Sequence, residues 1–374
     1  MTTVAQIQSA ADARTRLQSR PARIAVFNYN LPRPGFKRGG VDRVAHELAD
    51  GLARRGHRVV VYSHDPKPAG AAYDVVELPW RRFVSSAAGK RITMGYLGNV
   101  LALLPRLGDA EVVISHGDSL LLPLAGRPVV RVMHGSALDE ARTATSLNRR
   151  VLQFGVYWIE LLTALTNRNC VAVSASTRRS NPLIRRVIPN GVDLTLFSPD
   201  LRVRSSVPSL LFVGAMGGRK RGHWLLQQFV SRIKPRVPLA ELHVVGDLGP
   251  ESADVFYHTG LTNEQLAALY RRAWVYASPS TYEGFGLPYL EALASGTPVV
   301  ATSNPGSLEV LAAGRYGRLV EDDSFADAVV ELLEDPAARA EMACRGLERA
   351  TACSLEHTID SYETLVLSLV KSRG

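Results

Sequence analysis

The chain has 374 residues, of which 46% are hydrophobic and 21% are charged, and this is the composition of an ordinary soluble globular protein. Because the length is more than one hydrophobic core usually serves, we expect two domains. The three cysteines are scattered without ligand spacing, which argues for a reducing compartment and against a disulfide framework or a zinc site. No apolar run approaches the ~20 residues that span a bilayer. The first 22 residues also lack the apolar core of a signal peptide. We therefore expect a cytoplasmic protein with a flexible leader over residues 1–22.

The balance of charge is strongly basic, with a formal net charge of +9 and a pI of about 9.6. Such a balance favours anionic partners, namely nucleic acid, an acidic membrane surface or phosphorylated substrates. An arginine-rich composition can equally be a general feature of the proteins of one genome, unrelated to function. The charge alone does not decide between these alternatives.

The first half of the chain begins as a parallel α/β domain. A strand is predicted at 23–27, a polar loop at 28–40, a helix at 41–52 from its apolar spacing, and a second strand at 58–62. Further short apolar runs follow at 111–115, 129–133 and 170–173. This strand–loop–helix–strand order is typical of parallel sheets covered by helices.

A second series of strands starts after a linker. The linker is marked by Asn190-Gly191, Pro199 and a polar stretch to Val207, and strands are predicted at 209–213, 242–246, 274–277 and 298–301. Their continuous apolar character indicates strands covered on both faces. A final helix is predicted over 355–370. The pattern indicates two doubly wound domains with a cleft between them, and ligands bind such sheets beyond the carboxyl ends of the strands.

One stretch after a predicted strand carries two acids around a glycine turn. Glu283, Gly284, Phe285 and Gly286 precede a helix over 287–294, and Glu291 lies about one turn into that helix. Backbone N–H groups at such a helix start suit an anion or a polyhydroxyl ligand. The alternative is that the two glutamates only cap the turn and complement the helix dipole.

This stretch, continued by Gly296-Thr297-Pro298-Val299-Val300-Ala301, resembles the E-x7-E motif of retaining GT-B glycosyltransferases, in particular glycosyltransferase family 4 and the glycosyl transferases of group 1. The resemblance covers most of the chain. It extends to Gly39-Gly40-Val41, to the interdomain segment Asn190–Asp193, to Gly214 with Arg219–Gly222, and to Gly260–Leu266.

The resemblance implies an α/β protein of GT-B architecture, with two doubly wound Rossmann-like domains facing a central cleft. The implied segments are an acceptor-binding domain at 23–199, a nucleotide-sugar-binding domain at 200–354, and a helix at 355–374 that crosses back to the first domain. The implied reaction moves a sugar, with retention, from a nucleotide-diphosphate sugar to a hydroxyl of a polysaccharide, glycolipid or natural-product intermediate. It needs neither a cofactor nor a metal, and the sequence has no Asp-x-Asp motif.

The resemblance also implies the site residues. The catalytic residues would be His134, Glu283 and Arg221. The donor would be bound by Gly39, Gly40, Gly214, Arg219, Lys220, Arg221, Gly260, Leu261, Glu283, Gly284, Phe285, Gly286, Leu287 and Glu291. In this scheme Glu291 binds the ribose, Glu283 the donor sugar, the basic cluster the diphosphate, and His134 the sugar. His116 is a weaker candidate for the acceptor side.

Each of these assignments has an alternative. A basic tripeptide is usually a solvated face, and a lone histidine is usually structural. Ala215 stands where the family often has arginine, which leaves open which cation holds which phosphate and whether the chain is a noncatalytic member. A nucleotide-sugar epimerase would lack the E-x7-E pattern. A nucleic-acid-binding protein would need basic residues interleaved with aromatics, but aromatics are only 7%.

Contact with an anionic membrane is a further hypothesis. Basic and apolar residues mix between Trp80 and Leu97, a composition that suits a peripheral membrane surface. A core helix with snorkelling arginines explains the same pattern.

Overall fold

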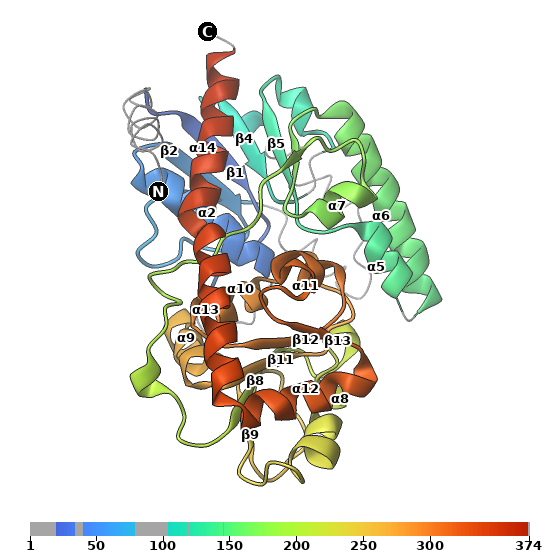
Figure 1. Ribbon diagram of the computed structural model, residues 1–374. Helices are drawn as coiled ribbons and strands as arrows, with labels where there is room; N and C mark the ends of the chain where they lie inside the picture. The colour runs from blue at the N-terminus through green and yellow to red at the C-terminus, as the bar shows by residue number, and fades with distance from the viewer. Residues whose placement is uncertain (1–19, 34–39, 79–103, 118–119, 145, 373–374) are drawn as a thin grey trace, which may run out of the picture.

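The computed structural model describes residues 20–33, 40–78, 104–117, 120–144 and 146–372. In these ranges the chain forms two parallel β-sheets, each flanked by helices (Figure 1). The strands are β1 (Arg23–Phe27), β2 (Arg58–Ser63), β3 (Asp74–Glu77), β4 (Val112–Ser115), β5 (Val129–Met133), β6 (Cys170–Ala172), β7 (Arg186–Val187), β8 (Ser209–Gly214), β9 (Glu241–Gly246), β10 (Val255–His258), β11 (Val275–Ser278), β12 (Val299–Thr302) and β13 (Arg318–Val320). The helices are α2 (Gly40–Arg54), α5 (Ala137–Thr143), α6 (Leu147–Thr166), α7 (Ala175–Ser180), α8 (Gly222–Gln228), α9 (Asn263–Arg272), α10 (Leu287–Ala294), α11 (Pro305–Val310), α12 (Asp322–Glu334), α13 (Pro336–Ala352) and α14 (Leu355–Lys371).

The two sheets share one topology. The first has the strand order β3-β2-β1-β4-β5-β6-β7 and the second has the order β10-β9-β8-β11-β12-β13. All neighbouring strands in both sheets pair in parallel. Counted from the first strand of each half, this is the 3-2-1-4-5-6 order of doubly wound nucleotide-binding folds, with β7 as an extra edge strand. The predicted pair of doubly wound sheets is confirmed. Their switch points lie between β1 and β4 and between β8 and β11.

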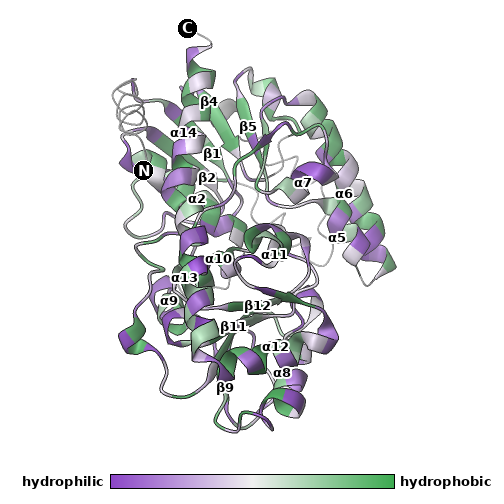
Figure 2. Ribbon diagram, in the orientation of Figure 1, coloured by the Kyte–Doolittle hydropathy of each residue, from purple (hydrophilic) through white to green (hydrophobic). Residues whose placement is uncertain are grey.

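Both faces of the second sheet are covered, as its continuous apolar strands indicate. Phe212 of β8 packs in one core with Leu225 of α8 and Phe325 of α12. The next residue back, Leu211, points to the opposite face and packs in a second core with Tyr270 of α9. Because side chains alternate along a strand, a strand covered on both sides is buried at consecutive positions, as β8 is from Leu210 to Phe212. Figure 2 shows the strands of both sheets as mainly hydrophobic.

The last helix returns to the first half of the molecule. The α13 helix packs against α10, whereas α14 packs against α2 (Figure 1). A Cβ atom on Gly51 of α2 would lie 2.3 Å from Cδ1 of Ile359, so the two helices meet at a position without a side chain. Arg55 also pairs with Glu356, Asp360 and Glu363 of α14, at 2.7, 2.7 and 2.6 Å. The predicted helix at 355–370 is confirmed, and the domain boundaries stay predictions.

Several sequence-based predictions fall on parts of the chain that the structure does not describe. They are most of the leader at 1–22, the glycine Gly39, and the basic and apolar segment from Trp80 to Leu97. In the described part of the chain, no helix combines the length and the apolar character that a membrane crossing requires.

Candidate active site

The carboxyl ends of β8 and β11 bring two loops together at the switch point of the second sheet. The loop after β8 contains a short 3-10 turn, Gly218–Lys220. The loop after β11 leads through Thr281 to Glu283. A hydrogen bond of 2.9 Å from the N–H of Thr281 to the carbonyl of Arg219 joins the two loops. The predicted basic cluster and the first glutamate therefore lie side by side, at the edge where doubly wound folds bind ligands.

Two cations hold the carboxylate of Glu283, which is 6% exposed. Nζ of Lys220 donates to Oε1 at 2.5 Å, and Nη1 of Arg219 donates to Oε2 at 3.3 Å. Arg219 also donates to the carbonyl of Tyr282 at 2.7 Å. Charge-assisted bonds of this kind offset part of the cost of burying a carboxylate. The cluster presents two cations and one anion to the adjoining space.

Arg221 points elsewhere, although it follows Lys220 directly. Its backbone is left-handed (φ 58°), and its guanidinium pairs with Asp322 at the start of α12, with bonds of 2.8 and 2.6 Å. Its Cζ also lies 4.3 Å from the ring centre of Trp224. The predicted catalytic role of Arg221 stays a prediction, and it would require this pair to open.

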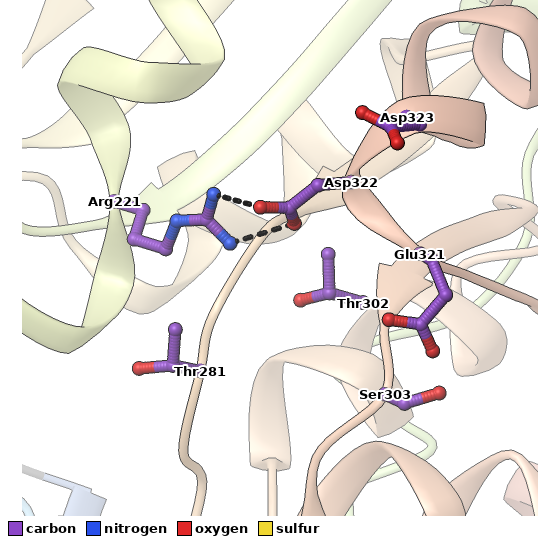
Figure 3. Close-up of a pocket in the computed structure, with 7 residues that line it drawn as sticks. All are labelled: Arg221, Thr281, Thr302, Ser303, Glu321, Asp322 and Asp323. Carbon is purple, nitrogen blue, oxygen red and sulfur yellow. Dashed lines mark hydrogen bonds and ion pairs between the residues drawn. The ribbon is translucent and has the colours of Figure 1, made fainter. Parts of the chain in front are cut away.

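The Arg221–Asp322 pair borders a pocket beyond the ends of β11, β12 and β13 (Figure 3). Its volume is about 390 Å³. Apart from one arginine, its side chains are hydroxyl and acidic groups. The lining residues are Arg221, Thr281, Thr302, Ser303, Glu321, Asp322 and Asp323. Neither glutamate of the E-x7-E motif lines this pocket, so it is a separate hollow beside the candidate site.

The glycine turn after Glu283 packs against the opposite half of the molecule. A Cβ atom on Gly284 would lie 2.4 Å from the carbonyl oxygen of His134, so only glycine fits there. Gly286 has φ 97° and starts α10, a conformation that favours glycine. The N–H of Ser136 donates to the hydroxyl of Tyr282 at 3.2 Å, beside the same contact. Phe285, which follows Gly284, is 5% exposed and belongs to the larger hydrophobic core.

The remaining predicted donor residues lie along the same edge. A Cβ atom on Gly214 would lie 3.1 Å from Cδ of Lys220, so this glycine leaves room for the lysine over the strand end. In the opposite half of the molecule, Gly40 opens α2 next to Leu287 of α10. Gly260 and Leu261 follow β10, which is two strands from β8.

His134 and His116 form a hydrogen-bonded pair at the carboxyl ends of β5 and β4. Nδ1 of His116 lies 2.8 Å from Nε2 of His134, and their ring centres are 5.1 Å apart. His134 is half-buried, while His116 is buried. Burial, together with the charge of Arg131, lowers the pKa of His134 to about 3. Burial, aided by His134 and Arg131, likewise holds the pKa of His116 well below its ordinary value.

Both rings are therefore neutral at pH 7, and one proton lies between the two nitrogens. The other ring nitrogen of His116, Nε2, has no hydrogen-bond partner among the described residues. His116 thus lies behind His134 and orients it. The predicted place of His116 on the acceptor side stays a prediction.

Glu291, the second glutamate of the motif, is bonded to the first half of the molecule. It is 3% exposed and accepts a hydrogen bond of 2.6 Å from Nη1 of Arg43 on α2. Nε of Arg43 donates to Glu47 at 2.7 Å. Burial opposes the charge of Arg43, yet Glu291 and Glu47 raise its pKa above the ordinary value. Burial raises the pKa of Glu47.

Sequence reasoning did not single out Arg43. The signal available was the i,i+4 pair of Arg43 and Glu47 on the helix that follows the glycine loop. Such pairs are common on exposed helix faces, so the pattern alone does not point to a site. Asp193, at the end of the interdomain segment, fixes the turn that follows by accepting hydrogen bonds from the N–H groups of Thr195 and Leu196.

Among the described residues, no group of three or more His, Cys, Asp or Glu side chains is arranged to hold a metal ion. Two facing doubly wound sheets, with cations and a buried glutamate at the switch point, define a glycosyltransferase of the GT-B class. The model of "Glycosyltransferase Family 4" matches residues 38–196, and that of "Glycosyl transferases group 1" matches residues 207–335. The two models together cover most of the chain, and the chain belongs to the glycosyltransferases of family 4 and group 1.

Known proteins resemble the chain over nearly its whole length. The D-inositol 3-phosphate glycosyltransferase of Pseudarthrobacter chlorophenolicus is 26% identical, over 93% of this chain and 96% of that protein. The structure of sucrose-phosphate synthase from Thermosynechococcus elongatus superposes with a TM-score of 0.76 at 21% identity, over 94% of this chain and 100% of that one. The structure of Anabaena HepE with UDP-glucose superposes with a TM-score of 0.69 at 18% identity, over 92% of this chain and 99% of that one. The two solved structures share the fold with this chain.

Proposed function

We propose that this glycosyltransferase moves a sugar from a nucleotide-diphosphate sugar to a hydroxyl acceptor, with retention of configuration and without a metal. One observation carries the proposal. Lys220 and Arg219 converge on Glu283 at the switch point, directly beside the amides of the glycine turn and within one residue of the contact with His134. A diphosphate needs cations and N–H dipoles, and a sugar needs acceptors and donors for its hydroxyls. Both kinds of group meet here.

The charges suit departure of a nucleoside diphosphate. Two cations near a strand end can stabilise the negative charge that grows on the leaving oxygen. In this proposal the sugar binds next to Glu283, whose carboxylate would stabilise positive charge on the anomeric carbon. The neutral His134 can exchange a hydrogen bond with a sugar hydroxyl without adding charge.

The reaction balances without a separate base. The acceptor oxygen bonds to the anomeric carbon on the face from which the diphosphate leaves, and the bond between that carbon and the phosphate oxygen breaks. The acceptor proton passes to the departing phosphate. The metal-independent form of this step requires the protein cations to supply the positive charge, and Arg219 and Lys220 are positioned to do so.

The donor and acceptor classes draw support from the relatives. HepE was solved with UDP-glucose, and the Pseudarthrobacter relative is named for an inositol phosphate acceptor. For this chain we propose a nucleotide-diphosphate sugar as donor, and as acceptor a hydroxyl of a carbohydrate, a glycolipid or a small polyol.

The test is the thermal stabilisation of the protein by UDP, GDP, ADP, dTDP and CDP in the presence of EDTA. A nucleotide at about 100 times its dissociation constant adds ~2.7 kcal/mol. We expect one nucleotide to raise the melting temperature, and Lys220→Met to abolish this shift. Arg202→Met, which removes an exposed arginine outside the strand-end cluster, serves as the control and should retain the shift.

Retention is tested separately, by following the anomeric proton of the product with NMR when the matching sugar nucleotide is supplied. A product of inverted configuration would overturn the proposed stereochemistry, and activity abolished by EDTA would overturn metal independence. No stabilisation by any nucleotide, in a folded sample, would favour a noncatalytic member of the family.

A further inference from the structure

The long helix α6 exposes an apolar stripe. Its members lie at successive intervals of four, three, four, four and three residues, which places them on one face of a helix. Their exposed fractions run from 43 to 72%, and they are Leu147, Val151, Phe154, Trp158, Leu162 and Leu165. Figure 2 shows hydrophobic segments along α6, at the outer edge of the molecule. A monomeric protein seldom leaves so many large apolar side chains together in water.

The stripe lies opposite the face by which α6 is attached. Thr163 and Ala164 are buried against the protein. The hydroxyl of Tyr157 donates to the carbonyl of Ser180 at 2.8 Å, and the side chain of Asn181 donates to the carbonyl of Glu160. At 100° per residue these anchoring positions point away from the stripe. The stripe is therefore not an edge of the protein's own core.

Arginines lie next to α6, where the neighbouring segment is attached to it. The two hydrogen bonds above place the end of α7 and the segment after it against α6. That region carries four exposed arginines, Arg178, Arg179, Arg185 and Arg186. None of the four forms an ion pair with another residue in the described ranges. The one acid of α6, Glu160, is half-buried on the attached side. The surface around α6 thus combines exposed apolar side chains with unneutralised positive charge.

We propose that α6 and the arginines beside it form a docking surface for an anionic lipid membrane, with α6 lying in the plane of the headgroups. A helix of 20 residues is about 30 Å long, and apolar stripes flanked by cations bind in this way. Arginines near an anionic surface contribute favourably, and a tryptophan such as Trp158 suits the interface between headgroups and acyl chains. A second copy of the chain is a poorer occupant, since pairing α6 with α6 about a twofold axis would bring the like-charged arginine segments together.

The test is sedimentation of the full chain with two kinds of vesicle. One is phosphatidylcholine alone, and the other contains about 30% phosphatidylglycerol to make the surface strongly negative. We expect binding to the anionic vesicles that weakens as salt is added. Trp158→Ser/Leu162→Ser should weaken it at least tenfold. The control, Leu201→Ser/Leu239→Ser, removes two leucines of the second half that are even more exposed, at 75 and 69%, and should leave binding unchanged.

The need for positive charge in membrane binding is tested by a second variant and its control. Arg178→Ser/Arg179→Ser/Arg185→Ser should weaken binding at least tenfold and flatten its salt dependence. Arg202→Ser/Arg345→Ser/Lys371→Ser removes the same formal charge elsewhere and should have little effect. Bromine-labelled acyl chains should quench tryptophan fluorescence in the parent protein but much less in Trp158→Phe, which keeps the apolar stripe.

Vesicle binding that the α6 variants leave unchanged would overturn the proposal, as would the absence of binding to anionic vesicles at low salt. A dimer seen by analytical ultracentrifugation, without vesicle binding and lost in Trp158→Ser/Leu162→Ser, would assign the stripe to a second copy instead. No step needs a sugar nucleotide, so the outcome is independent of the proposed reaction.

Discussion

Arg43 on α2 and Glu291 on α10 join the two halves of the molecule through a hydrogen-bonded ion pair of 2.6 Å, with the guanidinium over the ring of Phe197. Both side chains are largely withdrawn from water. The glutamate expected to bind the donor ribose is thus already bonded to the opposite domain. A donor would have to share Glu291 with Arg43 or displace it.

Replacing Arg43 by methionine should therefore destabilise the protein. The change leaves Glu291 and Glu47 buried without their cation, and removing one partner of a buried ion pair costs about 3–5 kcal/mol. The midpoint of urea unfolding measures the loss. The double variant Arg43→Met/Glu291→Gln should recover part of it, and an unchanged midpoint in the single variant would contradict the prediction.

Adding a methyl group at Gly284 should separate the two halves where they touch. The Cβ atom of alanine would meet the carbonyl oxygen of His134 at 2.4 Å, and neither backbone can yield locally. We expect a loss of roughly 10- to 100-fold in kcat/KM, because small displacements of reacting groups have effects of this size. Gly155→Ala, in open space on α6, is the matched control and should keep full activity with a soluble acceptor. Full activity in Gly284→Ala would show that this contact is not needed for catalysis.

His116→Phe tests whether His116 positions His134. Phenylalanine keeps the ring packing and removes both the 2.8 Å hydrogen bond and the unpartnered Nε2 atom. We expect kcat to fall roughly 10-fold or more, with nucleotide affinity and melting temperature little changed. A direct role of His116 in acceptor binding predicts instead a rise in the acceptor KM at constant kcat.

Glu160 gives the stability of the protein a defined pH dependence. Burial raises the pKa of its carboxyl from 4.5 to about 7, so the folded state binds this proton more tightly than the unfolded chain. Its contribution is fully present below pH 4.5 and is lost as the pH rises through about 7. Glu160→Gln avoids that loss and should be more stable than the parent at pH 8, by roughly 1–3 kcal/mol.

The same comparison at pH 4 should show no difference, because the parent carboxyl is then protonated in both states. Urea unfolding at the two pH values measures both results. Equal stability at pH 8 would mean that Glu160 is not held in its protonated form by burial.

Much of the fold can be predicted from the sequence, because strands buried on both faces have continuous apolar runs. The strand at 23–27 and the helix at 287–294 occur at the predicted residues. Two edge strands of the first sheet were not predicted: β3 has only two half-buried valines between an exposed acid at each end, and β7 is only two residues long. The helix α6 was also missed, because its apolar residues lie on both the attached and the exposed faces and the helical period is hidden.

The neighbours of the candidate site were less predictable than its members. The convergence of Lys220 and Glu283 follows from the topology, since the loops after β8 and β11 must meet. The pairing of Arg221 with Asp322 does not, because it depends on the left-handed backbone at Arg221. The Arg43–Glu291 pair joins residues 248 positions apart on different domains, and no local pattern records such a contact.

The position of α14 has a consequence for synthesis on the ribosome. The surface of α2 around Gly51 and Arg55 is completed by residues that emerge from the exit tunnel some 300 positions later. The first half therefore stays without its covering helix during most of translation, although its strands β1 to β7 are made early. We expect nascent chains arrested before α14 to be captured by chaperones and cut readily by proteases within α2, and chains long enough to expose α14 to become resistant.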